Sequence, residues 1–431
     1  MLSSNLTVGE SGHLYFGGQD TVELAKEYGT PLYVMDEVRI RENMRMYLRA
    51  FAEHFGAGSK PLYASKANSF KRIYEIAKEE GMGIDVVSSG EIYTALKAGF
   101  PLENAYFHSN NKTDWDIAFA MDNGVGYFVV DNREELDMID QIAGEKGKKQ
   151  PILLRLTPGV DPHTYEAIAT GKVDSKFGTA IETGQAREMV RHTLSLPNID
   201  LKGFHCHVGS QVFGEDIYER ASEIMLKFMY DCEQEFSVKL EQLDMGGGYG
   251  VRYMDGDDYV DIPEAIGRVA KHMKAYCESL GMGLPKIFME PGRSIAADAG
   301  LTLYSVGTIK KITGYKNYVS VDGGMTDNPR YALYGSKYTV YHANRPLDEK
   351  NLVADVVGRC CESGDIVQPD VALPEPRRGE IIAVCTTGAY NYSMASNYNR
   401  VNRPAMVMVT PEKAYLAIRR ESLEDLVRND V

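Results

Sequence analysis

The sequence lacks the features that would place it in a membrane, outside the cell or on nucleic acid. It contains no apolar run long enough for a membrane span, and residues 1–18 have neither the basic start nor the apolar core of a secretory signal. Acidic residues outnumber basic ones by 61 to 47, and the net charge of −14 argues against a nucleic-acid or anionic-membrane partner. The six cysteines lack paired metal-type spacing. We therefore expect a cytoplasmic protein with reduced thiols.

The chain also lacks internal repeats and low-complexity linkers, and from about residue 37 short apolar runs alternate with helical stretches. Helical periodicity is expected over 38–55, 71–80, 91–98, 114–122 and 262–280. The apolar runs predict buried strands at 61–65, 84–87, 105–108, 127–130, 152–156, 201–207, 240–244 and 287–290. Eight buried strands with helical crossovers favour a (β/α)8 barrel of the TIM type over an open doubly wound sheet.

The pattern changes after residue 293, where strand-like segments follow one another without long helices. These segments are 302–312, 318–321, 337–342, 353–358, 366–371, 381–384 and 405–409. They predict a mostly antiparallel β-sandwich or β-barrel, to which residues 13–18 add a strand. At 431 residues, the chain is too long for one ordinary domain. We predict a barrel domain of residues 36–293 and a β-domain of residues 1–35 and 294–431.

Polar residues stand at the ends of the predicted barrel strands. They are Lys66, Ser88, Asp131, Arg155, His207, the glycines that follow Asp244, and Glu290. Active sites of such barrels lie at the carboxyl ends of the strands. The coincidence of polar residues with strand ends therefore predicts a catalytic barrel.

Lys66 ends the run LYASK, and an amine at the mouth of an apolar strand loses solvation. This lowers the pKa of a lysine and makes it a nucleophile for carbonyl groups. Such a lysine can hold pyridoxal phosphate (PLP) as a Schiff base. A solvated lysine at a strand end is the alternative interpretation.

Three successive glycines follow the seventh predicted strand, within the run GGGYG. Glycine lets backbone N–H groups approach a phosphate closely, although a plain tight turn has the same composition. Phosphate sites recur late in barrels of this kind, which favours a phosphate site. The residues are Gly246, Gly247 and Gly248.

The run His205-Cys206-His207 crowds possible metal ligands together. On a strand the two histidines share one face and the cysteine points to the other, and no third histidine or carboxylate cluster is evident, so we do not expect zinc. His207 suits stacking on a cofactor ring, with Ser210 near its phosphate. His205 better fits a core histidine.

Further candidates follow the barrel. Glu290 could keep a pyridine nitrogen protonated, and Arg293 could present its planar fork to a substrate carboxylate, while a surface ion pair would explain either residue singly. Cys361 beside Glu362 could donate a proton and bind an ammonium group, and a buried structural cysteine is the alternative. Tyr390 could reach a phosphate, or could be a core tyrosine. Arg330 and Tyr334 follow the run DGGM.

Nearly the whole chain, from about residue 29 to residue 404, resembles the diaminopimelate decarboxylases, PLP enzymes of the alanine-racemase-like fold. The resemblance rests on a combination of motifs: YASKAN, DVVSSGE, SKFG, HVGSQ, GGGYG, EPGRS, DGGM, CESGD and GAYNYSMASNYN. Decarboxylases that act on ornithine, arginine or carboxynorspermidine share the lysine, the glycine loop and EPGR. The segments around Phe177 and Glu362 look most like the diaminopimelate branch.

The resemblance implies decarboxylation of meso-2,6-diaminopimelate to L-lysine and CO2, with a role for each matching residue. Lys66 would carry PLP, His207 would stack on its ring and Glu290 would pair with its pyridine nitrogen. Cys361 would serve as proton donor. The phosphate would be surrounded by Ser210, Gly246, Gly247, Gly248 and Tyr390. The distal end of the substrate would be bound by Arg293, Arg330, Tyr334 and Glu362, with Tyr390 nearby. The resemblance also implies a homodimer in which Cys361 and Glu362 reach the partner's active site.

Three positions depart from the family pattern. Cys360, Asn402 and Met406 differ from the residues that the family commonly has there.

The sequence also allows alternative functions to be weighed. A polyamine-pathway decarboxylase would be favoured by acidic residues in place of Arg330. A non-catalytic relative would be expected to lack Lys66 or the proton donor, and the long second domain with CESGD argues against a racemase.

Overall fold

The computed structural model describes residues 1–160, 175–214 and 216–431. These residues form two compact units. The barrel unit consists of Met44–Gly250 and Tyr259–Gly292, and the β-rich unit consists of Met1–Asn43, Val251–Asp258 and Arg293–Val431. In the described part of the chain, no helix is long and apolar enough to cross a membrane.

Eight parallel strands close into a ring in the barrel unit. They are β5 (Lys60–Ala64), β6 (Gly83–Val86), β7 (Ala105–Phe107), β8 (Tyr127–Val130), β9 (Gln150–Thr157), β11 (Ile199–His205), β12 (Gln242–Asp244) and β13 (Lys286–Met289). Each strand pairs with the next, and β13 pairs with β5 to complete the ring. Each overlaps one of the eight predicted strands, so the predicted barrel is confirmed. A short strand, β10 (Thr179–Ala180), adds to the edge of β9.

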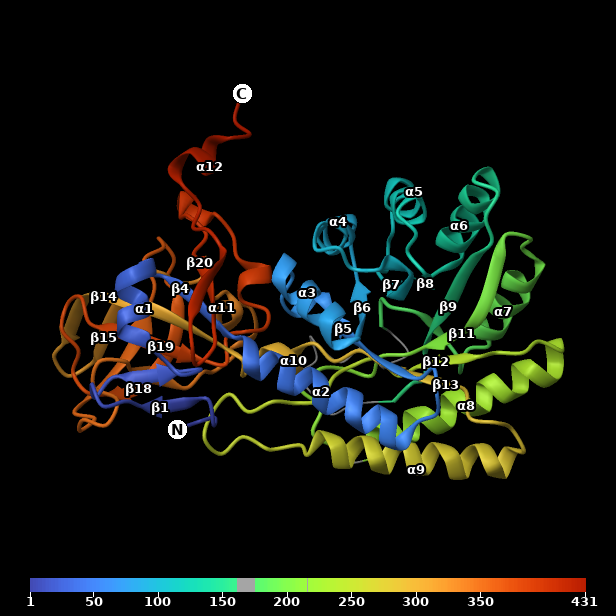
Figure 1. Cartoon of the computed structure of the whole chain (residues 1–431), viewed down its shortest axis with the longest axis horizontal. Coiled ribbons are helices and arrows are strands. Elements are labelled where there is room, and N and C mark those ends of the chain that lie inside the picture. The colour runs from blue at the N-terminus through green and yellow to red at the C-terminus, as the bar shows by residue number, and fades with distance from the viewer. Residues whose placement is uncertain (161–174, 215) are drawn as a thin grey trace. The chain divides into compact units, whose positions relative to one another are not determined.

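Helices lie around the ring of strands (Figure 1). They are α3 (Lys71–Glu80), α4 (Ser89–Lys97), α5 (Asp114–Asp122), α6 (Arg133–Glu145), α7 (Gln185–Ser195), α8 (Ile217–Phe236) and α9 (Ile262–Leu280), with α2 (Glu37–His54) before β5. Ser88, Thr113, Asn132 and Asp261 cap four of these helices by accepting hydrogen bonds from their first-turn N–H groups. Three of these caps follow β6, β7 and β8, so side chains at the carboxyl edge fix where the chain turns outward.

Apolar and aromatic side chains fill the inside of the ring. Leu62, Tyr106, Val129, Leu153 and Phe288 form one buried cluster, and Tyr127 stacks on Tyr106 with ring centres 4.5 Å apart. The ring is thus a packed core, as in other barrels of this type. A ligand must therefore bind at an edge of the barrel and not within it.

The β-rich unit contains a mixed sheet with a small N-terminal sheet. The small sheet comprises β1 (Leu6–Val8), β2 (Leu14–Phe16) and β3 (Gln19–Asp20). The larger sheet comprises β4 (Leu32–Asp36), β14 (Gly300–Ile312), β15 (Lys316–Val321), β16 (Val340–His342), β17 (Leu352–Val357), β18 (Ile366–Leu373), β19 (Ile381–Cys385), β20 (Ala405–Val409) and β21 (Ala414–Ile418). Its short helices are α1 (Thr21–Tyr28), α10 (Arg293–Ala296), α11 (Arg330–Tyr334) and α12 (Leu423–Val427). Most pairings are antiparallel, as predicted.

Strand β4 was not predicted, although all five of its residues are buried. It pairs antiparallel with β14 and parallel with β20. Both partner strands lie hundreds of residues later in the sequence. β4 itself is short and leads directly into helix α2, so no local pattern marked it as a strand. β4 is thus a central strand, hydrogen-bonded along both edges.

Candidate active site

Lys66 lies immediately beyond the carboxyl end of β5. It belongs to a 3-10 turn, Ser65–Ala67, which is held at its start by the Ala64 N–H donating to the Pro291 carbonyl oxygen at 3.1 Å. The side chain is exposed, because the turn carries it out of the packed strand end. We expected Lys66 to lose solvation at the strand end, but its side chain is exposed there. Its positive charge acts on Asp85 and on His207.

The three glycines form a tight loop after β12. Gly246 and Gly248 have positive φ angles of 68° and 123°, which side chains rarely allow. A Cβ atom on Gly247 would lie only 2.1 Å from the backbone oxygen of Glu290. The loop is thus restricted to glycine by its close approach to neighbouring backbone. Such a loop can bring N–H groups against an anion, as the sequence predicts.

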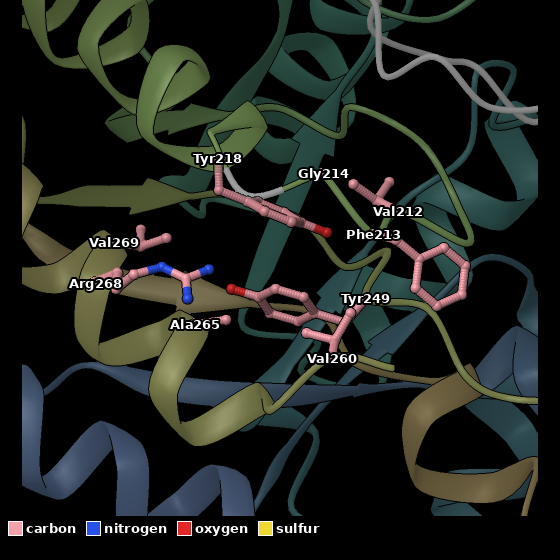
Figure 2. Close-up of a pocket in the computed structure, with 9 residues that line it drawn as sticks. All are labelled: Val212, Phe213, Gly214, Tyr218, Tyr249, Val260, Ala265, Arg268 and Val269. Atoms are coloured by element: carbon pink, nitrogen blue, oxygen red, sulfur yellow. The ribbon is translucent and has the colours of Figure 1, made fainter. Parts of the chain in front are cut away.

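Two buried tyrosines, Tyr218 and Tyr249, lie side by side (Figure 2), and Tyr218 contacts the glycine loop. The Tyr218 hydroxyl donates to the Gly247 carbonyl oxygen at 3.1 Å, and the Tyr218 and Tyr249 ring centres are 4.6 Å apart. A cavity of about 20 Å³ adjoins them, lined in part by Phe213 and Arg268. This volume is large enough for one water molecule and too small for a substrate.

His207 and Ser210 lie on the loop that follows β11, and this loop runs beside the glycine loop. The Gly247 N–H donates to His207 Nδ1 at 3.2 Å, and Val212 forms a parallel bridge with Tyr249. Burial, together with the charge of Lys66, lowers the pKa of His207 well below its usual value. His207 is therefore a neutral imidazole at pH 7, accepting at Nδ1. The structure thus brings His207 and Ser210 to the same edge as the glycines.

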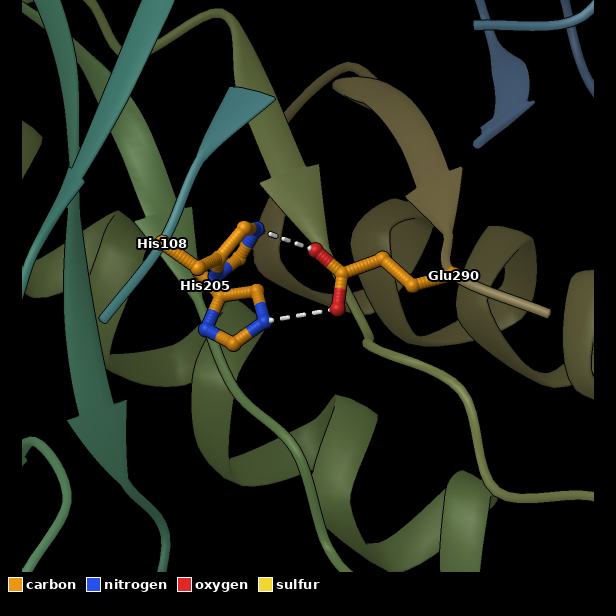
Figure 3. Close-up of side chains that lie close together, drawn as sticks. All are labelled: His108, His205 and Glu290. Atoms are coloured by element: carbon orange, nitrogen blue, oxygen red, sulfur yellow. Dashed lines mark hydrogen bonds and ion pairs between the residues drawn. The ribbon is translucent and has the colours of Figure 1, made fainter. Parts of the chain in front are cut away.

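Glu290 is buried just beyond β13, between two histidines (Figure 3). Its Oε1 lies 2.6 Å from His108 Nε2, and its Oε2 lies 3.2 Å from His205 Nε2. Burial alone would raise the pKa of Glu290, but the interactions with His108 and His205 lower it well below the usual value. The carboxylate therefore stays ionised at neutral pH. The alternative interpretation of Glu290 as a surface ion pair is excluded.

The expectation that no third histidine or carboxylate accompanies the His205 run was wrong. His108, His205 and Glu290 offer three ligand atoms within 4.8 Å of one another. The ring closure brings together the ends of β7, β11 and β13, which no local pattern could show. His205 is hydrogen-bonded to Glu290 at 3.2 Å, and His108 Nε2 lies 2.6 Å from Glu290 Oε1, so both histidines contact the carboxylate directly. We interpret the two histidines as support for the Glu290 carboxylate.

Sequence reasoning gave no role to His108 or to Asp85. His108 Nε2 lies 3.8 Å from the buried Asp85 carboxylate as well as against Glu290. Burial raises the pKa of Asp85, with His108 acting in the opposite direction. The only available signal was position, since His108 ended the third predicted strand and Asp85 lay within the second. His205 is buried as a core histidine would be, but it is also hydrogen-bonded to Glu290.

In the β-rich unit, Arg293, Arg330, Tyr334 and Tyr390 lie together. The Arg293 and Arg330 guanidinium groups lie 4.6 Å and 5.4 Å from the centre of the Tyr390 ring, and Arg330 lies 5.2 Å from the Tyr334 ring. Both arginines are buried, and Arg293 donates to the Tyr253 hydroxyl at 2.6 Å. Two buried cations around one aromatic ring can bind an anion bidentately.

Cys361 and Glu362 lie on the loop between β17 and β18, and both side chains are exposed. The Cys361 N–H donates to Asn399 Oδ1 at 3.0 Å, and the Tyr398 hydroxyl donates to Glu362 Oε1. The alternative of a buried structural cysteine is excluded for Cys361. Arg293 and Arg330 do not lie on this loop but at the starts of α10 and α11.

The groups at the carboxyl edge of the barrel fit a phosphorylated pyridine aldehyde such as PLP. The glycine loop leaves no room for a Cβ atom at Gly247, which is what close backbone approach to a phosphate requires. The buried, ionised Glu290 can keep a pyridine nitrogen protonated, and His207 offers a flat neutral ring. Lys66 supplies an amine at the same edge.

Comparisons with known proteins agree with a PLP-binding barrel. Residues 38–297 match the model of the pyridoxal-binding domain of pyridoxal-dependent decarboxylases. The diaminopimelate decarboxylase of Bacillus subtilis (strain 168) is 42% identical over 422 residues, covering 98% of this chain and 96% of the relative. The diaminopimelate decarboxylase of Mycobacterium tuberculosis (strain ATCC 25618 / H37Rv) is 40% identical over 436 residues, covering 99% and 97%.

Solved structures extend the similarity to the fold of the whole chain. The crystal structure of diaminopimelate decarboxylase from M. jannaschii in complex with L-lysine has a TM-score of 0.91 and 31% identity, and covers 100% of this chain and 99% of that one. The Helicobacter pylori enzyme complexed with L-lysine has a TM-score of 0.84 and 32% identity, covering 94% and 98%. The chain belongs to the PLP-dependent diaminopimelate decarboxylase family.

Proposed function

We propose that this protein decarboxylates meso-2,6-diaminopimelate to L-lysine and CO2, the last step of lysine biosynthesis. The observation that carries this proposal is similarity over the whole chain, since relatives named diaminopimelate decarboxylase match 98% of it at 42% identity. The match therefore includes the β-rich unit, whose arginines and acidic loop would select the substrate, and not only the cofactor-binding barrel.

When bound, PLP supplies an electron sink for the electron pair left behind as CO2 departs. Lys66 would hold the cofactor through its Nζ atom. Glu290 would keep a pyridine nitrogen protonated, and its ionisation is supported by the pKa that His108 and His205 hold low. His207 would pack its neutral ring against the cofactor. Ser210, the glycine loop and Tyr390 would bind the phosphate.

The distal end of the substrate carries a carboxylate and an ammonium group. Arg293 and Arg330 bind the carboxylate with Tyr334, which is supported by their shared position around one aromatic ring. Glu362 binds the ammonium group. A substrate without this end would lose the contacts of its carboxylate with both arginines, which is costly. Ornithine, which has no distal carboxylate, should therefore be rejected.

Cys361 donates the proton that replaces CO2 at the α-carbon. We propose that it does so in the active site of a partner chain, within a homodimer, and that Glu362 accompanies it. The exposure of both side chains supports this assignment. We further propose a cytoplasmic location, in agreement with six free thiols.

The test is CO2 release from meso-diaminopimelate, ornithine, arginine and carboxynorspermidine, measured in parallel with the PLP-loaded protein. We expect turnover of the first substrate alone. Arg330→Lys keeps the positive charge but loses the planar fork, so it should raise KM for meso-diaminopimelate more than it lowers kcat. Preference for another substrate would refute the proposed function. Retention of a normal KM by Arg330→Lys would refute only the role of Arg330.

A further inference from the structure

The orientation of the glycine loop depends on how its three carbonyl groups are held. The Gly246 carbonyl oxygen accepts from the backbone N–H of Glu290, and the Gly248 carbonyl oxygen accepts from that of Val212, both at 2.9 Å. The Gly247 carbonyl oxygen instead accepts from a side chain, the Tyr218 hydroxyl, at 3.1 Å. The peptide between Gly247 and Gly248 is thus the part of the loop that a single hydroxyl group fixes.

Fixing this carbonyl also fixes an N–H group. In a planar trans peptide the C=O and the following N–H point in opposite directions. With its carbonyl turned toward Tyr218, the peptide must direct the Gly248 N–H away from the tyrosine. The Gly247 N–H is used by His207 Nδ1. Among the hydrogen bonds of the described residues, none comes from the Gly248 N–H, which leaves that group able to bind an anion.

Tyr218 is well placed to hold this geometry. It is the second residue of α8, its side chain is buried, and its hydroxyl lies 2.9 Å from where a Cβ atom of Gly248 would stand. Burial raises the pKa of Tyr218 well above its usual value, so the hydroxyl keeps the proton that it donates. The ring is packed against Tyr249, as Figure 2 shows.

Tyr249 provides a matched control within the same cavity. It is a second buried tyrosine, but its hydroxyl has no hydrogen-bond partner among the described residues. Removing the Tyr249 hydroxyl therefore changes the composition of the cavity without releasing a loop carbonyl.

We propose that the Tyr218 hydroxyl is a positioning group for the phosphate of the cofactor, acting through the Gly247–Gly248 peptide. This inference rests on the proposed placement of that phosphate at the glycine loop. The hydroxyl does not touch the phosphate. It holds the peptide whose N–H group does, so its loss should affect the phosphorylated cofactor and spare the dephosphorylated form, pyridoxal.

The test compares Tyr218→Phe and Tyr249→Phe with the wild-type apoenzyme, using PLP and pyridoxal as the two probes. Binding is followed by absorbance of the lysine adduct, and thermal melts check that each variant folds. Tyr218→Phe should weaken PLP binding about three- to tenfold, the usual effect of one lost hydrogen bond, with pyridoxal binding unchanged. Tyr249→Phe should leave both affinities unchanged, and at saturating PLP it should keep the wild-type kcat.

The outcomes separate this inference from the proposed function. If Tyr218→Phe weakens the binding of PLP and of pyridoxal equally, the hydroxyl has a merely structural role. If the PLP affinity is unchanged, the hydroxyl has no role in binding the cofactor. Either result overturns this inference and leaves the proposed function standing. A loss of PLP affinity in Tyr249→Phe equal to that in Tyr218→Phe would overturn it too. Wild-type protein that binds neither probe would instead refute the cofactor site.

Discussion

Replacing His205 should flatten the pH dependence of apoenzyme stability between pH 7 and pH 5. His205 is 1% exposed, and burial lowers its pKa to about 4. In the unfolded chain a histidine takes up its proton near pH 6.5. Between these two values the unfolded state therefore binds more protons than the folded state. Stability is complete above pH 6.5 and falls as the pH decreases toward 4.

The size of the effect follows from this difference in proton uptake. Integrated from pH 7 to pH 5, it lowers the free energy of unfolding by about 2 kcal/mol. His205→Gln removes the titrating group but keeps an N–H donor that can reach Glu290. The variant should therefore lose about 2 kcal/mol less than the wild type over the same pH range.

The assay is urea unfolding of the apoenzyme at several pH values, followed by far-ultraviolet circular dichroism. This signal reports loss of the helices around the barrel strands. His54→Gln is the control, because His54 is 29% exposed and its Nε2 lies 3.9 Å from the Glu53 carboxylate. It should follow the wild-type curve. Equal pH dependence in the wild type and His205→Gln would refute the reasoning.

Three further predictions concern the glycine loop, the shared active site and a buried ion pair. Gly247→Ala should abolish measurable PLP binding, since its Cβ would lie 2.1 Å from a backbone oxygen that cannot yield; a wild-type affinity in absorbance titration would contradict this. Lys66→Ala and Cys361→Ala chains, each inactive, should regain about a quarter of wild-type CO2 release when refolded together, and no recovery would count against a shared site. Lys112→Met leaves the buried Glu135 without the amine 2.7 Å away and should cost about 3–5 kcal/mol in urea unfolding, which a second change, Glu135→Leu, should largely restore.

Much of the barrel could be predicted because its signals are local. Apolar runs of strand length and helical stripes of 3.6-residue period depend only on near neighbours in the sequence. Side chains such as Ser88 and Asn132, which cap α4 and α6, likewise act within a few residues. The order of these elements then favoured one closed topology. Strand β4 was missed, since its burial comes from β14 and β20.

The candidate site was predictable in its residue types but not in its contacts. Lys66, His207, the glycine loop and Glu290 were proposed from the sequence because each stands at the end of a predicted strand or directly after one, and each carries a recognisable motif. The two histidines on Glu290 were not found, and the solvation of Lys66 was misjudged. Those properties depend on neighbours that come from other strands.

The sequence by itself determined the elements, their order, and which reactive groups stand at strand ends, because these follow from local spacing and residue type. Only the tertiary structure decided which of those groups meet. His205 reaches Glu290 across 85 residues, and Tyr218 reaches the Gly247 carbonyl across 29. Closing a ring of strands sets such distances in space, and no periodicity along the chain encodes them. The ionisation of Glu290 and the direction of the Gly248 N–H are therefore properties of the fold.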